Sequence, residues 1–207
     1  MPQPQFFFGA MSPYSWFAAE RIEAVLADAR WRGVLAGAVF KANGRVSWGT
    51  TDRRAPGISD CEARAAEHGL GPMRWPQPWP TSDLLVARAM AFAELDGRLK
   101  CFALEAMRLC FLEGADLAEL DSVLEAARRS GIGDGELECG LAEQATKDAL
   151  RRTTDEALAL GVIGVPTVAV GEELFWGDDR LEEAADAHAR LARGEPDHAG
   201  GERSISS

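Results

Sequence analysis

A run of three aromatic residues that leads straight into a helix start is the feature that most constrains this fold. Residues 5–8 (QFFF) form a short apolar run, typical of a strand buried on both faces. Ser12 then suits a helix N-cap, and Pro13 suits the first helical position because its missing N–H would be unsatisfied there anyway. Apolar residues carry this helix to about Ala29, and residues 31–38 are expected to form a second strand. This order predicts a βαβ unit with a right-handed crossover.

The middle of the chain has a different character. Between about residues 51 and 154 it is rich in Ala, Leu and Glu, with apolar residues three and four apart. That pattern predicts helices near 61–68 and over 84–95, 98–113, 117–129 and 135–160. A loop rich in proline and tryptophan at 71–81 separates the first of these helices from the others.

Strand patterns return near the C-terminus. Residues 167–170 are β-branched, Gly171 and Glu172 make a tight turn, residues 173–176 form the partner strand, and a helix follows over 180–193. The order βαβ, helical block, ββα predicts an α/β fold, with a thioredoxin-like domain built from residues 1–50 and 161–193. A large all-helical insertion of residues 51–160 interrupts it, and residues 194–207 are expected to form a disordered tail.

Charge and cysteine usage limit the partners. With 33 acidic and 22 basic residues the net charge is -11, so no nucleic acid and no anionic membrane is expected as a partner, because both require a basic face. The sequence has no apolar run of about 18 residues and no leader with a basic start. Its four cysteines, at positions 61, 101, 110 and 139, form neither a CxxC pair nor a metal-type cluster. We therefore expect a cytoplasmic protein with free thiols and no metal site.

Residues 12–15, Ser-Pro-Tyr-Ser, lie at the strand–helix junction where a thioredoxin fold keeps its C-x-x-C pair. A serine hydroxyl forms no disulfide, but it can donate a hydrogen bond, and the helix N-terminus adds partial positive charge. Together they would favour the thiolate of a bound thiol, lowering its pKa from the free value of about 8.5. The simpler alternative is that Ser12 only caps the helix, and the two roles are compatible.

Val165 and Pro166 stand directly before the third expected strand, where thioredoxin folds carry a cis-proline. In the cis form, Pro166 would turn the backbone of Val165 outward. Its N–H and C=O could then pair with an extended, peptide-like ligand.

The last strand ends in Trp176, and Asp178 and Asp179 begin the final helix. Asp179 could accept a hydrogen bond from an α-amino group while the N–H groups of the helix start hold the neighbouring α-carboxylate. Such a clamp would suit the γ-glutamyl end of glutathione. Ordinary helix capping by the two acids is the alternative.

Five segments together resemble the 2-hydroxychromene-2-carboxylate isomerase family, which belongs with the kappa-class glutathione transferases in the DsbA-like superfamily. The segments occur in the right order, and the similarity covers about residues 5–192. They are FFF at 6–8 with SPYS at 12–15, GAVFKA at 37–42, FLEGAD at 111–116, GVIGVPT at 161–167 and ELFWGDDRL at 173–181.

The resemblance implies a role for each matched position. In that isomerase a thiolate adds to a conjugated enone, a former double bond rotates and the thiol leaves, so glutathione is recycled. A homodimer and a small aromatic or electrophilic substrate are implied as well. The implied roles are catalysis for Ser12, glutathione binding for Val165, Pro166, Trp176, Asp178 and Asp179, and substrate binding for Tyr14, Lys41 and Ser82.

Departures from the family pattern bear on the substrate. Members often have an acidic and an aromatic residue where this chain has Gly9 and Ala10, an asparagine where it has Ser82, and Gly-Asn where it has Gly44-Arg45. We expect the small residues at 9 and 10 to open the substrate pocket. Trp75 and Trp79 are expected either to wall an aromatic substrate or to stiffen their proline-rich loop.

The leading hypothesis is a glutathione-dependent isomerase of conjugated aromatic acids similar to 2-hydroxychromene-2-carboxylate. The alternatives are a kappa-like glutathione transferase, using glutathione or another low-molecular-weight thiol on a different electrophile, and a non-catalytic DsbA-like binding protein. A disulfide oxidoreductase is disfavoured because the expected site has no paired thiol.

Overall fold

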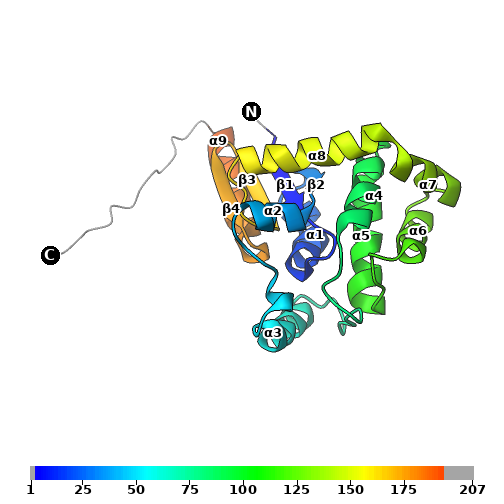
Figure 1. Cartoon of the computed structure of the whole chain (residues 1–207). Coiled ribbons are helices and arrows are strands. Elements are labelled where there is room, and N and C mark those ends of the chain that lie inside the picture. The colour runs from blue at the N-terminus through cyan, green and yellow to red at the C-terminus, as the bar shows by residue number, and fades with distance from the viewer. Residues whose placement is uncertain (1–2, 194–207) are drawn as a thin grey trace.

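Four short strands form one mixed sheet near the middle of the molecule in the computed structural model, which describes residues 3–193 (Figure 1). The sheet order is β2-β1-β3-β4, with bounds Gln5–Phe8 for β1, Arg30–Gly33 for β2, Thr167–Val170 for β3 and Glu173–Trp176 for β4. Strand β1 is parallel to β2 and antiparallel to β3, and β3 and β4 form a hairpin. Because the helical block lies between β2 and β3 in the chain, the predicted thioredoxin-like α/β fold with a helical insertion is confirmed.

The aromatic run explains why β1 is a central strand. Phe6, Phe7 and Phe8 are all fully buried, so both faces of β1 are covered. Phe6 and Phe8 share one face and pack on Trp31 of β2, with ring centres 5.1 and 5.3 Å apart. Phe7 points to the opposite face and belongs to a second cluster, with Val34 and other apolar side chains. The strand therefore contributes to two hydrophobic cores.

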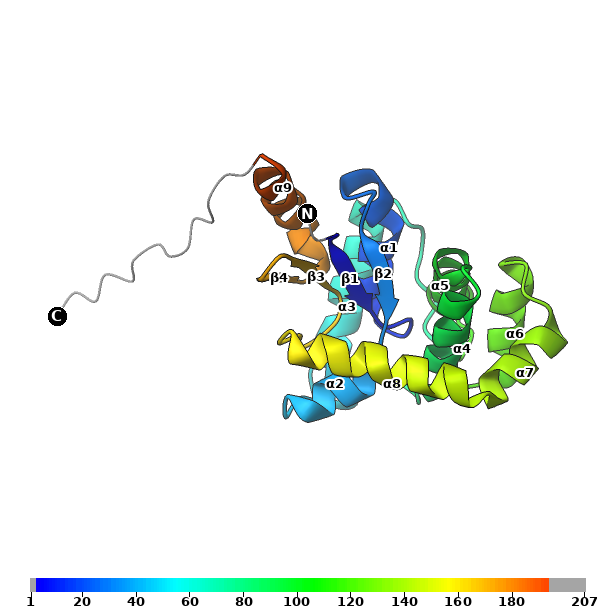
Figure 2. The ribbon, with the colours of Figure 1, turned by 90° about the horizontal axis from the view of Figure 1, so that it is seen from above.

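Two pairs of helices cover the sheet (Figure 2). Helices α1 (Pro13–Val25) and α9 (Leu181–Ala192) pack together on the face that carries Phe6 and Phe8. Helices α2 (Ala36–Ala42) and α8 (Gln144–Ala159) cover the face that carries Phe7.

The other helices are α3 (Arg54–Glu67), α4 (Leu84–Leu95), α5 (Leu99–Arg108), α6 (Leu120–Arg129) and α7 (Asp134–Ala142), with short turns at Trp48–Thr50, Leu109–Glu113 and Asp178–Arg180. Figure 1 shows α6 and α7 at the end of the molecule remote from α9, and α3 below the sheet.

Several predicted boundaries differ from the structure: α1 ends at Val25 rather than near Ala29, and α3 begins at Arg54 rather than near Cys61. Two larger differences change the elements themselves. The expected strand over 31–38 ends at Gly33, because Ala36 begins helix α2 and its residues Ala36 and Val39 are buried three positions apart, as on one face of a helix. The expected helix over 135–160 is interrupted at Glu143, whose backbone is extended. The chain changes direction there, so that α7 packs against α4 and α6 while α8 runs along α4, β2 and α2.

A buried arginine ties the helical block to the sheet. Arg32 of β2 is 5 % exposed and contacts Glu94 of α4 and Glu156 of α8. Because α8 itself covers the sheet, the boundaries expected for the insertion, 51–160, stay a prediction. The tail expected at 194–207 lies outside the described residues. Within the described part, no helix is both long and apolar enough to span a membrane.

Candidate active site

A cavity with a volume of about 940 Å³ opens between the sheet, helix α2 and the loops of the insertion. Most of the predicted site residues line it. These are Ser12, Tyr14, Lys41, Val165, Pro166, Trp176, Asp178 and Asp179. Residues from both ends of the sequence thus meet in one place. None of the four cysteines contributes to its wall.

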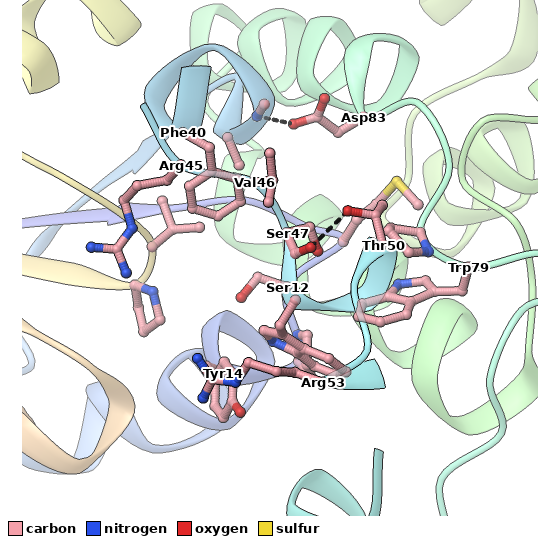
Figure 3. A pocket seen from close by; sticks show the side chains of 18 of the residues that line it. Ser12, Tyr14, Phe40, Arg45, Val46, Ser47, Thr50, Arg53, Trp79 and Asp83 are labelled. Atoms are coloured by element: carbon pink, nitrogen blue, oxygen red, sulfur yellow. Dashed lines mark hydrogen bonds between the residues drawn. The ribbon is translucent and has the colours of Figure 1, made fainter. Parts of the chain in front are cut away.

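Ser12 lies at the N-terminus of α1, on the cavity wall (Figure 3). Its Oγ accepts a hydrogen bond from the N–H of Ser15 at 3.3 Å, so it does cap the helix. The Oγ of Ser15 in turn accepts from the N–H of Gly9 at 3.3 Å, which braces the turn between β1 and α1. Capping uses only an oxygen lone pair of Ser12. Its hydroxyl proton therefore stays available to a group in the cavity, where the helix N-terminus adds positive potential.

Val165 lines the same cavity as Ser12. The Val165–Pro166 peptide bond is cis, as expected. Within the described residues neither the N–H nor the C=O of Val165 takes part in a backbone hydrogen bond. A donor and an acceptor suited to an extended, peptide-like ligand are therefore available beside Ser12.

Asp178 and Asp179 are neighbours in the sequence but differ in exposure and in their hydrogen-bond partners. Asp178 is 2 % exposed, and its Oδ1 accepts from the guanidinium of Arg64 at 2.8 Å. Its backbone C=O accepts from Arg21 at 3.1 Å, while its buried Oδ2 has no hydrogen-bond partner among the described residues. Burial raises the pKa of Asp178, and Arg64 opposes that shift. Asp179 is exposed, so it is the member of the pair whose carboxylate a ligand can reach directly.

Tyr14 contributes its ring to the cavity and turns its hydroxyl away. The ring packs on Phe17 and Trp48, and the O–H donates to Asp60 at 3.4 Å. Burial raises the pKa of Tyr14, so the phenol keeps its proton. Cys61, close to that phenol, is fully buried, and burial raises the pKa of its thiol to about 12. A thiol in that state is a poor nucleophile.

Three cations without an ion pair among the described residues line the cavity. Lys41 is exposed on α2, Arg45 follows that helix, and Arg53 is exposed just before α3. In Figure 3, Arg45 and Arg53 lie on either side of Ser12. Asp83 is the acid on this side, and its Oδ2 accepts from the N–H of Gly37 at 3.0 Å.

Four expected residues lie elsewhere. Ser82 is exposed and outside the cavity, where its Oγ accepts from the N–H of Leu84. Gly9 and Ala10 are buried and are not among the residues that line the cavity, so the expectation that they open it stays a prediction. A Cβ at Gly9 would lie 2.9 Å from that of Ala36, which shows that the position is packed against α2. Trp75 stands behind the cavity.

Trp79 lines the cavity, and Trp75 supports it from behind with a ring-centre distance of 4.7 Å. Trp79 is 4% exposed and packs on Trp48 and Trp75, which agrees with the expected stiffening of the loop, while a contact with an aromatic substrate stays a prediction. No group of histidine, cysteine and acidic side chains suited to a metal ion occurs within residues 3–193.

Known proteins agree with this architecture. Residues 5–189 match the DsbA-like thioredoxin domain. The chain belongs to the DsbA-like thioredoxin family. This confirms the superfamily that the sequence motifs indicate. No curated protein matches the chain.

Solved structures of similar fold include enzymes of two kinds. A 2-hydroxychromene-2-carboxylate isomerase has a TM-score of 0.74 at 23% identity, over 92% of this chain and 96% of that chain. The cytosolic disulfide reductase DsbM from Pseudomonas aeruginosa, in a structure with GSH, has a TM-score of 0.61 at 18% identity, over 92% and 98% of the two chains. DsbA from Xylella fastidiosa gives 0.59 at 12% identity, over 93% and 87%. At these identities the likeness shows the fold.

Gly44 and Arg45, the departure from the family pattern that was expected to bear on the substrate, both line the cavity. Other residues of the cavity wall were not predicted. Asp83 is the neighbour of a predicted residue. Arg64 and Arg53 carry no such signal, because no sequence pattern shows that α3 faces the start of α9.

Proposed function

We propose that this protein is a thiol-dependent enzyme that uses glutathione to isomerise conjugated aromatic acids similar to 2-hydroxychromene-2-carboxylate. The observation that carries this proposal is the position of Ser12. Its hydroxyl lies at the N-terminus of α1, beside the unpaired backbone of Val165, in a cavity that no cysteine lines. The site is thus arranged to hold a sulfur that the protein itself does not supply.

The residues present fit a small peptide thiol. Val165 offers an unpaired N–H and C=O, as an extended backbone requires. Asp179 is exposed at the start of the last helix, and the neighbouring Asp178, paired with Arg64, lines the same cavity. The exposed carboxylate of Asp179 is suited to an ammonium group. The γ-glutamyl amine of glutathione has that chemistry, and Trp176 adds an apolar surface beside it.

Each element of the site has a physical task in this reaction. A bound thiol supplies a nucleophile that adds to the conjugated double bond and leaves after rotation about that bond. The Ser12 hydroxyl donates a hydrogen bond to the sulfur while α1 adds positive potential, so the thiolate is stabilised. Lys41 lies where an ammonium can meet the carboxylate of the substrate. Phe40 and Trp79 provide apolar surface for its ring.

A disulfide oxidoreductase is a weaker candidate, although solved relatives include a disulfide reductase. Cys61 is buried against Tyr14, and burial raises the pKa of its thiol to about 12. A kappa-like transferase acting on a neutral electrophile would use the same serine, and a binding protein would keep the thiol site without turnover.

The homodimer expected from the resemblance stays a proposal, which light scattering on the purified protein tests.

Turnover tests the proposal directly. The protein is screened against conjugated aromatic acids by ultraviolet absorbance, with and without glutathione. We expect isomerisation that requires both protein and glutathione, and a loss of about 10²-fold or more in Ser12→Ala, the scale of removing one preorganised donor to an anion. Ser12→Thr, which keeps the hydroxyl, is the matched control. Turnover that is independent of glutathione, or equal in Ser12→Ala, refutes the proposal.

A further inference from the structure

The backbone of Arg45 is held rigidly at the edge of the cavity. Helix α2 ends in a reversal at Gly44, whose φ is 63°. The N–H of Gly44 donates to the C=O of Lys41 at 3.1 Å, and the N–H of Arg45 donates to the C=O of Phe40 at 2.8 Å. These are the two bonds of a Schellman motif, which needs glycine at the left-handed position. The Cα of Arg45 is therefore fixed relative to Lys41.

The side chain of Arg45 is fixed as well. Its guanidinium carbon lies 4.4 Å from the centre of the Trp176 ring, and both residues line the cavity. The indole of Trp176 rests in turn against Gly164, where a Cβ would lie 2.7 Å from its Nε1. Arg45 thus spans from the end of α2 to the end of β4. A guanidinium stacked on a ring keeps its N–H donors free at the edge of its plane.

Those donors have no acidic partner in the described part of the chain. Some arginines are paired with carboxylates, as Arg108 is with Glu20 and Arg129 with Glu113, whereas Arg53 and Arg152, like Arg45, have no ion pair among the described residues. Arg45 differs from those two because its guanidinium stacks on the Trp176 ring in the cavity wall. An ordered guanidinium without a carboxylate is suited to an anion that comes from outside the chain.

The surroundings of Arg45 define the kind of anion. Lys41 adds a second unpaired cation, while Phe40 and Val46 add apolar surface next to it. Val46 is 72% exposed, an unusual state for a valine on a cavity wall. A carboxylate attached to an apolar or aromatic body matches this combination. A highly hydrated inorganic anion leaves the apolar surface unused.

We propose that Arg45 is a specificity-determining residue, which binds the carboxylate of the substrate and makes the cavity select organic acids over neutral compounds of the same shape. This inference rests on the proposed function and deepens it, because it separates an isomerase of acids from a transferase acting on neutral electrophiles. It also assigns to Arg45, rather than to Lys41 alone, the recognition of charge. An arginine can meet a carboxylate with two parallel hydrogen bonds, whereas a lysine offers a point charge.

Equilibrium binding without any thiol tests this inference. Cinnamate and its neutral methyl ester are titrated by calorimetry into the wild type, Arg45→Gln and Arg45→Lys. Arg152→Gln, which changes an exposed arginine of α8 outside the cavity, is the matched control. We expect Arg45→Gln to weaken cinnamate binding by about tenfold or more, the scale of charge-assisted hydrogen bonds, and to leave the ester unchanged. Arg45→Lys is expected to fall between, and Arg152→Gln to behave as the wild type.

Several results would overturn the assignment. A wild type that binds cinnamate no better than the ester removes the selection for acids. An equal loss for acid and ester in Arg45→Gln means that the residue only shapes the cavity. Glutathione is titrated into the same proteins, and a loss of glutathione binding in Arg45→Gln would assign the guanidinium to the thiol instead. If the wild type binds cinnamate through Arg45 but does not bind glutathione, the proposed function fails and the charge recognition stands.

Discussion

Asp83 anchors helix α2 from a distance of 46 residues in the sequence. The N-cap residue of α2, Leu35, offers no side-chain acceptor. Asp83 accepts from the N–H of Gly37 instead, so a side chain from the start of α4 caps a helix on the sheet. Because α2 carries Lys41 and leads to Arg45, this bond positions one wall of the cavity.

The helix-capping role of Asp83 indicates how much stability a substitution at this position should cost. Asp83→Ala removes the carboxylate that accepts from the first N–H groups of α2. The loss of such a cap lowers the free energy of unfolding by about 1 kcal/mol, with a range of roughly 0.5–2. For a chain of this size, about 1 kcal/mol corresponds to a fall of roughly 2–4 °C in Tm. Asp83→Asn keeps an acceptor and removes the buried charge, so its Tm at neutral pH is expected to lie close to that of the wild type.

The pH dependence has a definite sign. Burial raises the pKa of Asp83 in the folded state, although the N–H groups of Gly37, Asp83 and Ala36 oppose this. The folded carboxyl therefore holds its proton more tightly than the unfolded one. Its contribution to stability is complete below the ordinary pKa of 3.8 and is lost as the pH rises through the raised value. The wild type should gain stability over Asp83→Asn as the pH falls into that window.

Urea unfolding at a series of pH values measures both effects. Asp155→Asn, which changes an exposed aspartate of α8, is the control for the general effect of removing one negative charge. The reasoning is refuted if Asp83→Ala unfolds like the wild type at neutral pH. It is also refuted if lowering the pH does not raise the free energy of unfolding of the wild type relative to Asp83→Asn. The same holds if that change is no larger than the change relative to the Asp155→Asn control.

Two further predictions concern thiols and packing. With a chromogenic disulfide reagent at mildly alkaline pH, the exposed Cys101 and Cys139 should react in the native protein, while Cys61 and Cys110 should react only in denaturant because burial raises the pKa of both thiols. Rapid modification of Cys61 without unfolding would contradict the structure around Tyr14. Gly140→Ala places a Cβ about 2.2 Å from the Phe92 ring, so thermal unfolding should show a loss of roughly 1–3 kcal/mol, the cost of overpacking. An unchanged Tm would mean that α7 does not lie against α4 as described.

The strands at both ends of the chain could be predicted well because their signals are local. A triple-phenylalanine run, a β-branched segment and a Gly-Glu turn each specify their element without help from distant residues. Helix α2 was missed because a short apolar run fits a buried strand and a helix equally well, and tertiary packing decides between them. The break at Glu143 has the same origin, since both flanking segments favour helix and only their different packing partners separate them.

The site shows the same division. Ser12, Val165 and Asp179 could be placed because the order of elements brings the start of α1, the start of β3 and the start of α9 to one edge of the sheet. The pairing of Asp178 with Arg64 could not be predicted, because it joins two helices that are 114 residues apart in the sequence. Pairings of that kind depend on how the insertion packs against the rest of the domain, and no single segment of the sequence predicts this packing.

The central claim is that Ser12 and the N-terminus of α1 hold a borrowed sulfur as its thiolate. The ultraviolet absorbance of the thiolate, followed as the pH of the glutathione complex is varied, measures the pKa of the bound thiol. We predict a value below the free value of about 8.5 in the wild type and in Ser12→Thr, and a rise toward the free value in Ser12→Ala. Circular dichroism checks that Ser12→Ala, which also loses a helix cap worth about 1 kcal/mol, is still folded. A bound thiol whose pKa is unshifted in the wild type, or equally lowered in Ser12→Ala, would contradict the account.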